Sequence, residues 1–117
     1  MNITLRQISI FIEVARYLSI TKAANTLFLT QPAVSMQIKQ LEDMVGLPLL
    51  NHVGKKLSLT QAGEEFLKYC IKIKNELYAA KELMQEFKGV KRGTLNITVA
   101  STLSHFAVQT IKRFLLQ

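Results

Sequence analysis

The sequence predicts a mainly helical fold, and three observations lead to this prediction. Three short helical patterns fill residues 5–45, with a tight connection between the second and the third. A hairpin pattern follows, and a segment without proline then runs from residue 61 to about residue 88. Three helices and a hairpin make a winged helix-turn-helix. The predicted divisions are this domain (1–60), a long dimerisation helix (61–88), a hinge (89–92) and the first βα unit of a truncated α/β domain (93–117).

The first two helices are predicted from spacing and capping residues. Apolar residues recur three and four positions apart and end near Tyr17, beginning with Leu5, Ile8, Phe11, Ile12 and Ala15. Either Ser19 or Thr21 can then cap a second helix, "TKAANTLF". Its buried positions are predicted to be Ala23, Ala24 and Leu27, and the two alanines let another helix approach closely.

The third helix is predicted to run from Gln31 to about Val45. Thr30 is a good N-cap, Pro32 falls in the first turn where its missing N–H costs little, and Gly46 is a natural stop. One face is apolar, through Val34, Ile38, Leu41 and Val45. The opposite face mixes amides, a hydroxyl, apolar groups and one charge: Pro32, Ser35, Met36, Lys39 and Gln40.

The hairpin and the long helix complete the predicted fold. Two leucine-containing arms, 49–50 and 57–59, flank a turn at Gly54, and Thr60 caps the helix that follows. That helix, roughly 40 Å long, carries a heptad seam of seven residues: Phe66, Cys70, Ile73, Leu77, Ala80, Met84 and Phe87. A second copy of the chain is the simplest partner for the seam, and a missing part of the same chain is the alternative.

The last segment resembles the start of another domain. "GVKRG" breaks the helix, "TLNITVA" alternates as a strand does, and "STLSHFAVQTIKRFLLQ" is amphipathic. One strand and one helix are not stable alone. Residues 93–117 are therefore expected to open a larger domain.

Composition bounds the function. The apolar fraction of 49% and charged fraction of 20% suit a folded protein, and the net charge of +7 points to a polyanion, nucleic acid before membrane. A generic solvated surface explains the charge equally well. A single cysteine, and no signal peptide or membrane span, predict a cytoplasmic location. No catalytic cluster, phosphate loop or metal-ligand spacing is present, so neither an enzyme nor a cofactor or metal site is predicted.

The third helix of such a domain normally enters the major groove of double-stranded DNA. Gln31 can bond adenine, Ser35 can donate or accept, and Pro32 and Met36 can meet a thymine methyl. Thr30 at the N-cap belongs to the same predicted interface. Phosphate contacts are expected from Thr21, Lys22 and Lys39. In the wing, residues 51–57, contacts with the DNA backbone or the minor groove are expected from Lys55, Lys56 and, when protonated, His52. The simpler interpretations are helix capping for Gln31 and Ser35 and ordinary solvated side chains for the lysines.

The stretch "SITKAANTLFLTQPAVSMQIKQLEDMVGLPLL", followed by "LSLTQAG", resembles the N-terminal signature of LysR-type transcriptional regulators. The resemblance implies a homodimer joined through the linker helix, an inverted-repeat operator near a promoter, and indirect action on the transcription machinery. It also implies a two-lobed effector domain, pairing of dimers into tetramers, and a small co-inducer of unknown identity. By the same resemblance Ser101, Thr102 and Ser104 help to hold that co-inducer, and capping of a helix is their alternative role.

The sequence departs from the family pattern at the predicted interface. Met36 stands where many members have arginine, Asn51-His52 replaces an acidic-arginine pair, and Leu50 replaces a frequent phenylalanine. Losing two arginines is expected to weaken each half-site and to leave affinity to the dimer. A rival hypothesis is a winged helix used only for dimerisation or protein docking, whose binding depends little on salt.

Overall fold

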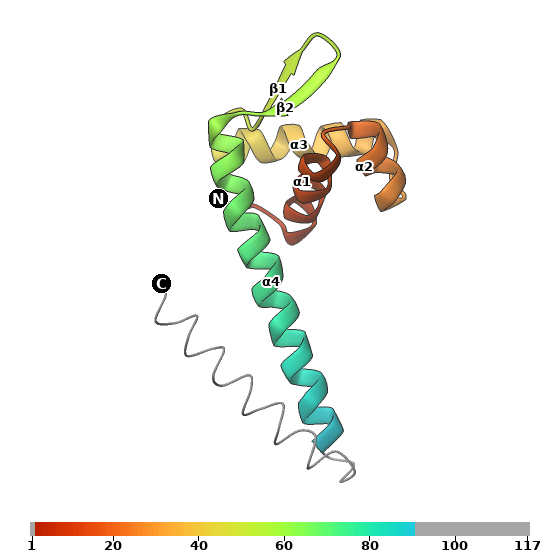
Figure 1. Ribbon diagram of the computed structural model, residues 1–117, viewed down its shortest axis with the longest axis vertical. Coiled ribbons are helices and arrows are strands. Elements are labelled where there is room, and N and C mark those ends of the chain that lie inside the picture. Colours follow the sequence, from red (N-terminus) through yellow and green to blue (C-terminus); the bar gives the residue numbers. More distant parts are fainter. Residues whose placement is uncertain (1, 91–117) are drawn as a thin grey trace. The chain divides into compact units, whose positions relative to one another are not determined.

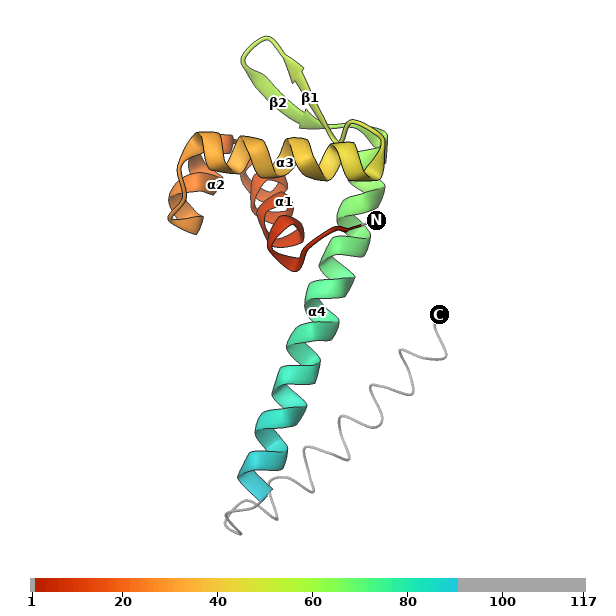
Figure 2. The same cartoon turned by 180° about the vertical axis from the view of Figure 1, so that it is seen from behind.

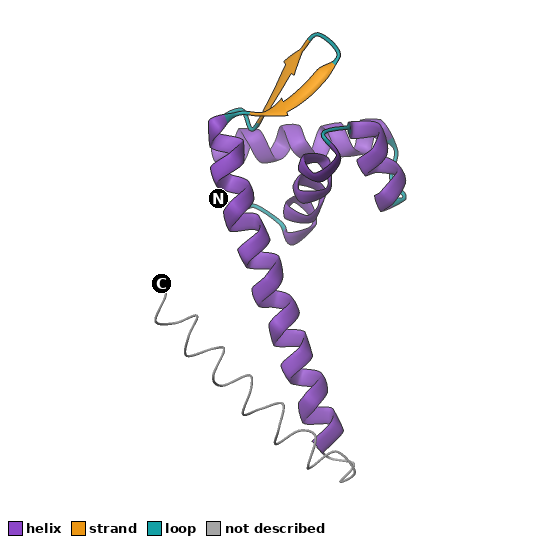
Figure 3. Ribbon diagram, in the orientation of Figure 1, coloured by secondary structure: helices purple, strands orange, loops and turns teal. Residues whose placement is uncertain are grey.

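The computed structural model describes residues 2–90 of the chain (Figure 1). It confirms three helices, a two-stranded wing and a long helix in the predicted order (Figure 3). Their bounds are α1 Leu5–Tyr17, α2 Ile20–Leu27, α3 Gln31–Val45, β1 Leu50–Val53, β2 Lys56–Leu59 and α4 Gln61–Val90. The predicted βα unit at 93–117, with Ser101, Thr102 and Ser104, lies outside the described residues.

Each of the first three helices begins at a hydroxyl cap. Thr4 forms a capping box with Gln7 at the start of α1. Ser19 caps α2, because its Oγ accepts from the Lys22 N–H at 3.1 Å, so Ser19 rather than Thr21 is the cap. Thr30 Oγ1 accepts from the Ala33 N–H at 3.2 Å and starts α3 as predicted. These bonds satisfy N–H groups that have no partner inside a helix.

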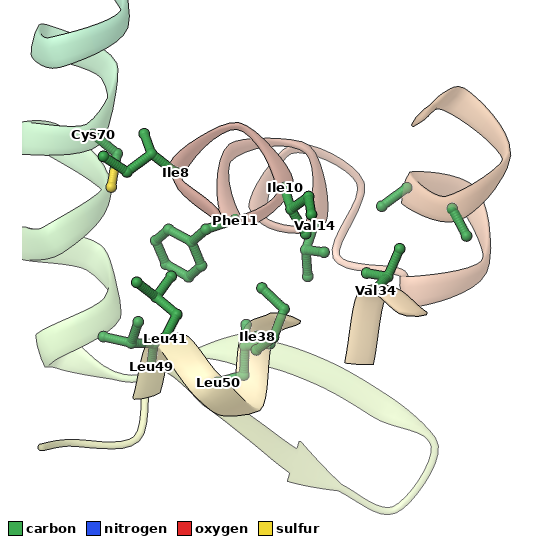
Figure 4. Packing of buried hydrophobic residues seen from close by; sticks show 12 residues of the cluster. Ile8, Ile10, Phe11, Val14, Val34, Ile38, Leu41, Leu49, Leu50 and Cys70 are labelled. Carbon is green, nitrogen blue, oxygen red and sulfur yellow. The ribbon is translucent and has the colours of Figure 1, made fainter. Parts of the chain in front are cut away.

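The core lies where α1, α2 and α3 pack on one another and on the start of α4 (Figures 2 and 4). Ala23 and Ala24 are buried, which confirms the close helix approach predicted for them. The apolar stripe of α3 is also confirmed, with Val34, Ile38 and Leu41 buried. Phe11 is fully buried at the centre of this cluster and its ring lies 5.7 Å from that of Phe66.

The wing is a short antiparallel hairpin that projects beyond the helices in both views (Figures 1 and 2). Leu50 pairs with Leu59, and His52 pairs with Leu57. Gly54 has φ +63, a conformation that glycine adopts without steric cost, and lies in the turn that joins the strands. Leu50 is buried whereas the rest of β1 is exposed, so only the base of the wing belongs to the core.

Helix α4 begins with a tight attachment to the segment before the wing. Thr60 Oγ1 accepts from the Gly63 N–H at 2.9 Å and donates to the Pro48 carbonyl at 2.7 Å, while the Thr60 N–H donates to the Leu49 carbonyl at 3.0 Å. Cα of Gly63 faces the Leu49 carbonyl so closely that a Cβ there would overlap its oxygen. The sequence predicted the cap but not this close packing.

The far end of α4 differs slightly from the prediction. The helix continues through Gly89 to Val90, so it does not end at Lys88 and the hinge does not start at residue 89. Glycine costs only about 1 kcal/mol inside a helix, which one turn of continuous hydrogen bonding can offset. Met1–Asn75 forms one compact unit, and α4 from Glu76 onward belongs to a second.

Part of the predicted dimer seam is used inside the chain. Cys70 is fully buried in the core, so its assignment to a dimer contact is wrong, and Phe66 packs on that core as well. The heptad pattern marks an apolar stripe but does not say which surface covers it. Ile73, Met84 and Phe87 are 43%, 51% and 57% exposed, and Ala80 is exposed too. Leu77 is half-buried.

The burial of Cys70 predicts an unreactive thiol and a loss of stability in alkali. Burial raises the pKa of the Cys70 thiol from 9.0 to about 11. The stabilisation is thus complete below pH 9 and is lost as the pH rises from 9 through 11, because the unfolded chain loses the proton first. We expect the free energy of unfolding, measured in urea, to fall faster over this range for the wild type than for Cys70→Ala. Equal slopes would contradict the prediction.

Candidate nucleic-acid interface

The outer face of α3 consists of Thr30, Gln31, Pro32, Ser35, Met36 and Lys39, and all six are exposed. The buried stripe of the same helix holds the opposite side of α3 against the core. Met36 is 56% exposed, so its side chain is open to contact from a partner. The structure therefore brings together, on one rigid helix, every residue of α3 that the sequence assigned to base or phosphate contacts.

The electrostatics around this face favour an anion. Neither α2 nor α3 has an acidic residue in its first turn, so the positive ends of both helix dipoles are uncompensated there. Between Glu13 and Glu64, 50 residues contain Arg16 and four lysines (22, 39, 55 and 56) but only two acids, at positions 42 and 43. Thr21 and Lys22 are exposed in the first turn of α2, where such an end can accept a phosphate.

Both acids of this segment have a partner of their own. Asp43 Oδ1 lies 3.6 Å from Lys39 Nζ, and these two side chains are 67% and 74% exposed. Exposed pairs of this kind contribute little, typically below about 1 kcal/mol, so Lys39 can exchange the carboxylate for a phosphate at small cost. The pairing has a signal in the sequence, because Lys39 and Asp43 stand four residues apart in a helix.

Glu42 fixes the wing to α3, a role that the sequence analysis missed. Its Oε2 accepts from the N–H groups of Leu49 and Leu50 at 2.7 and 3.2 Å. Hydrogen bonds to a carboxylate are roughly twice as strong as neutral ones. Glu42 thus helps to set the orientation of the wing relative to the outer face of α3. Its signal was an acid next to the apolar stripe in a segment otherwise poor in acids.

The wing residues assigned to DNA are all exposed, but they do not share one surface. Successive residues of a strand point to opposite faces, and the pairs His52–Leu57 and Val53–Lys56 are adjacent in the hairpin. His52 therefore lies on the face that carries Leu50 and Leu59, and Lys56 lies on the other face. Lys55 is in the turn. A duplex that contacts the tip can meet Lys55 together with either side chain.

Metal binding and membrane insertion are two further properties that the described residues address. Over residues 2–90, no cluster of three or more histidine, cysteine or acidic side chains is arranged to hold a metal ion. Among the helices that the structure describes, none combines the length and apolar character needed to span a membrane.

The chain is similar in sequence to known transcriptional regulators. The chain is 46% identical over 114 residues to a RuBisCO operon transcriptional regulator of Allochromatium vinosum, which covers 97% of this chain and 38% of that protein. It is 46% identical over 110 residues to the HTH-type transcriptional regulator CbbR of Rhodospirillum rubrum, covering 94% of this chain and 37% of that protein. The chain thus spans well under half the length of these curated relatives.

Solved structures share the fold as well. The BenM DNA-binding domain in complex with benA site 1 DNA has a TM-score of 0.69 and 31% identity, covering 72% of this chain and 94% of that one. A CbnR DNA-binding domain–DNA complex has a TM-score of 0.67 and 29% identity, covering 70% and 94%. Residues 5–64, just over half of the chain, match the model of the bacterial regulatory helix-turn-helix proteins of the lysR family, and the protein belongs to that family.

Proposed function

We propose that this chain is the DNA-binding part of a transcriptional regulator that binds an inverted-repeat operator as a homodimer. The observation that carries the proposal is the outer face of α3: exposed, uncharged at its N-terminal end, and held rigidly by a buried stripe. Such a face can enter a major groove without repelling phosphates. The solved DNA complexes of the BenM and CbnR DNA-binding domains support this orientation for α3.

The contacts divide between bases and backbone. Gln31 and Ser35 carry the hydrogen-bonding groups that distinguish base pairs, and Pro32 and Met36 offer apolar atoms to thymine methyl groups. Lys22, Lys39 and the wing lysines supply phosphate contacts, which position the domain without specifying sequence. Few lysines serve each half-site, so two copies bound together are needed for tight binding.

Self-association is supported by the exposed stripe of α4. Ile73, Met84 and Phe87 leave large apolar side chains in water on a helix of 30 residues. A second copy would cover them and would place two α3 helices about a two-fold axis, which requires a two-fold symmetric site. Two of the relatives are RuBisCO operon transcriptional regulators, which supports an operator close to carbon-fixation genes.

The rest of the proposed function concerns the longer protein. Residues 93–117 open an effector domain, in which Ser101, Thr102 and Ser104 help to bind a small co-inducer. The protein assembles into tetramers, acts in the cytoplasm, influences the transcription machinery through DNA, and catalyses no reaction.

A second candidate function is protein docking without strong DNA binding. Phe28 favours it, because this side chain follows α2 directly and is 95% exposed. Apolar docking would depend little on salt, whereas DNA binding through several phosphates weakens steeply as salt rises.

The test is selection of duplexes from a random pool by the 117-residue chain at two salt concentrations, followed by sequencing. We expect a two-fold symmetric site whose recovery drops sharply at the higher salt. The matched control is Gln31→Ala with Ser35→Ala, which keeps every charge and should lose sequence preference while retaining salt-dependent binding. A dimer that enriches no sequence at either salt concentration would favour the docking function.

Changing Met36 to arginine is expected to tighten operator binding by about 10-fold, because a guanidinium on the outer face of α3 can contact phosphate or guanine. Titration of the selected duplex by fluorescence anisotropy measures the change. Asn75→Arg adds the same charge at an exposed position of α4 and should alter affinity by less than about 2-fold. Equal gains in both variants would show a general charge effect and not a contact at position 36.

A further inference from the structure

Helix α4 is fastened to α1 by side chains spaced four residues apart. The Phe66 ring lies 5.7 Å from that of Phe11 with the planes at 51°. One turn later Cys70 is fully buried, and Figure 4 shows it beside Ile8. Residues four apart occupy the same face of a helix, so these contacts form a continuous stripe along α4.

The stripe ends in a polar contact one turn further on. Lys74 Nζ donates to Ser9 Oγ at 2.9 Å, across 65 positions of sequence. Ile73, the neighbouring residue, is 43% exposed and begins the part of the dimer seam that the chain leaves open. Lys74 thus lies where α4 leaves the first compact unit, Met1–Asn75. We call this set the α1–α4 joint: Phe66, Cys70 and Lys74 with Phe11, Ile8 and Ser9.

The α1–α4 joint and the contacts at the first turn of α4 both restrict the orientation of this helix. Thr60 and Gly63 hold the first turn against Leu49, and Lys74 holds the helix roughly 20 Å further along. Between these two points Phe66 and Cys70 pack on the core, and Lys74 is the outermost of the contacts that limit tilting of α4. Without the outer point, a tilt of about 10° about the first turn would displace α4 at Lys74 by ~3.5 Å, which is comparable to the ~3.4 Å between neighbouring base pairs.

We propose that Lys74 is a positioning residue: its hydrogen bond to Ser9 fixes the angle between α4 and the head (residues 2–59), and so sets the half-site spacing that a dimer accepts. This inference rests on the proposed function. Lys74 need not touch DNA for this role. Its removal changes which operator geometry is preferred and leaves the contacts within each half-site intact.

The first experiment uses duplexes with the same two half-sites at the selected spacing, one base pair shorter and one base pair longer. We expect Ser9→Ala and Lys74→Met each to weaken binding at the selected spacing by less than about 3-fold. The preference for that spacing over the two others should fall by at least about 5-fold. Ser9→Asp gives Lys74 a carboxylate partner and should increase the preference.

Lys72→Met is the matched control, because Lys72 Nζ lies over the Tyr69 ring at 5.2 Å on α4 itself. It removes the same charge and must leave the spacing preference unchanged. Unchanged preference in both Ser9→Ala and Lys74→Met would overturn the proposal. So would a uniform loss of affinity at all spacings in Lys74→Met but not in Ser9→Ala, since that would identify Lys74 as a phosphate contact.

A second measurement needs no DNA. Spin labels at Lys55→Cys in the wing and Lys81→Cys in α4 report the distribution of head-to-helix distances within one chain, while buried Cys70 stays unlabelled. Ser9→Ala should broaden the distribution and Ser9→Asp should narrow it. Distance distributions of equal width in the wild type and both variants would contradict the proposal that the Lys74–Ser9 hydrogen bond fixes the angle. If the wild type binds no duplex, the proposed function fails, and the distance distributions still decide whether Lys74 fixes the angle.

Discussion

Replacing Gly63 with alanine is expected to destabilise the protein by about 3 kcal/mol, although glycine-to-alanine changes inside helices normally stabilise by about 1 kcal/mol. The new Cβ would overlap the Leu49 carbonyl oxygen and lie 3.0 Å from its carbon. Because these are backbone atoms, no side-chain rotation can relieve the overlap. The same carbonyl accepts from the Thr60 N–H, so moving it also weakens the start of α4. Urea unfolding of both proteins measures the difference.

The control for Gly63→Ala is Gln61→Ala, two residues earlier in the same helix. Gln61 is exposed, so this change should alter the free energy of unfolding by no more than about 0.5 kcal/mol. A stabilised Gly63→Ala protein would mean that α4 does not pack on the Leu49 backbone as described.

Replacing Glu42 with alanine is expected to cost about 3 kcal/mol, because two backbone N–H groups lose a charged acceptor. Both belong to the segment that enters β1, so the wing should loosen before the helices unfold. Amide hydrogen exchange resolves the two effects: the Leu49 and Leu50 amides should lose protection most. Glu42→Gln keeps an acceptor oxygen without the charge and should fall between alanine and the wild type.

Asp43→Ala removes the neighbouring carboxylate and serves as the control for Glu42→Ala. Asp43 forms an exposed ion pair with Lys39, so the loss of stability should stay below about 1 kcal/mol. If the two alanine variants lost the same amount, the Glu42 bonds to the wing would contribute nothing measurable.

Local sequence signals predicted the helices because each signal had a single local cause. Thr30, Pro32 and Gly46 marked both ends of α3, and the stripe through Val34 and Ile38 identified its buried face. Where two residues of the same capping type stood close together, as at positions 19 and 21, only the folded backbone could decide between them.

The features that the sequence could not predict depend on distant partners. A heptad pattern is the same whether its residues face a second chain or the chain's own core, and Cys70 faces the core. The role of Glu42 required knowing that Leu49 returns to the end of α3. The exposed face of α3 was predicted correctly, whereas the contacts of Gln31 and Ser35 with bases remain predictions.

The burial of Cys70 has a consequence for how this protein can be divided. The predicted boundary at residues 60 and 61 passes through a folding unit, because Phe66 and Cys70 complete the core formed by α1 and α3. A fragment that ended at Thr60 would expose Phe11 and Ile8 to water. Any exchange of DNA-binding heads between relatives, by recombination or by design, must therefore carry the first four turns of the linker with the head and join after Asn75.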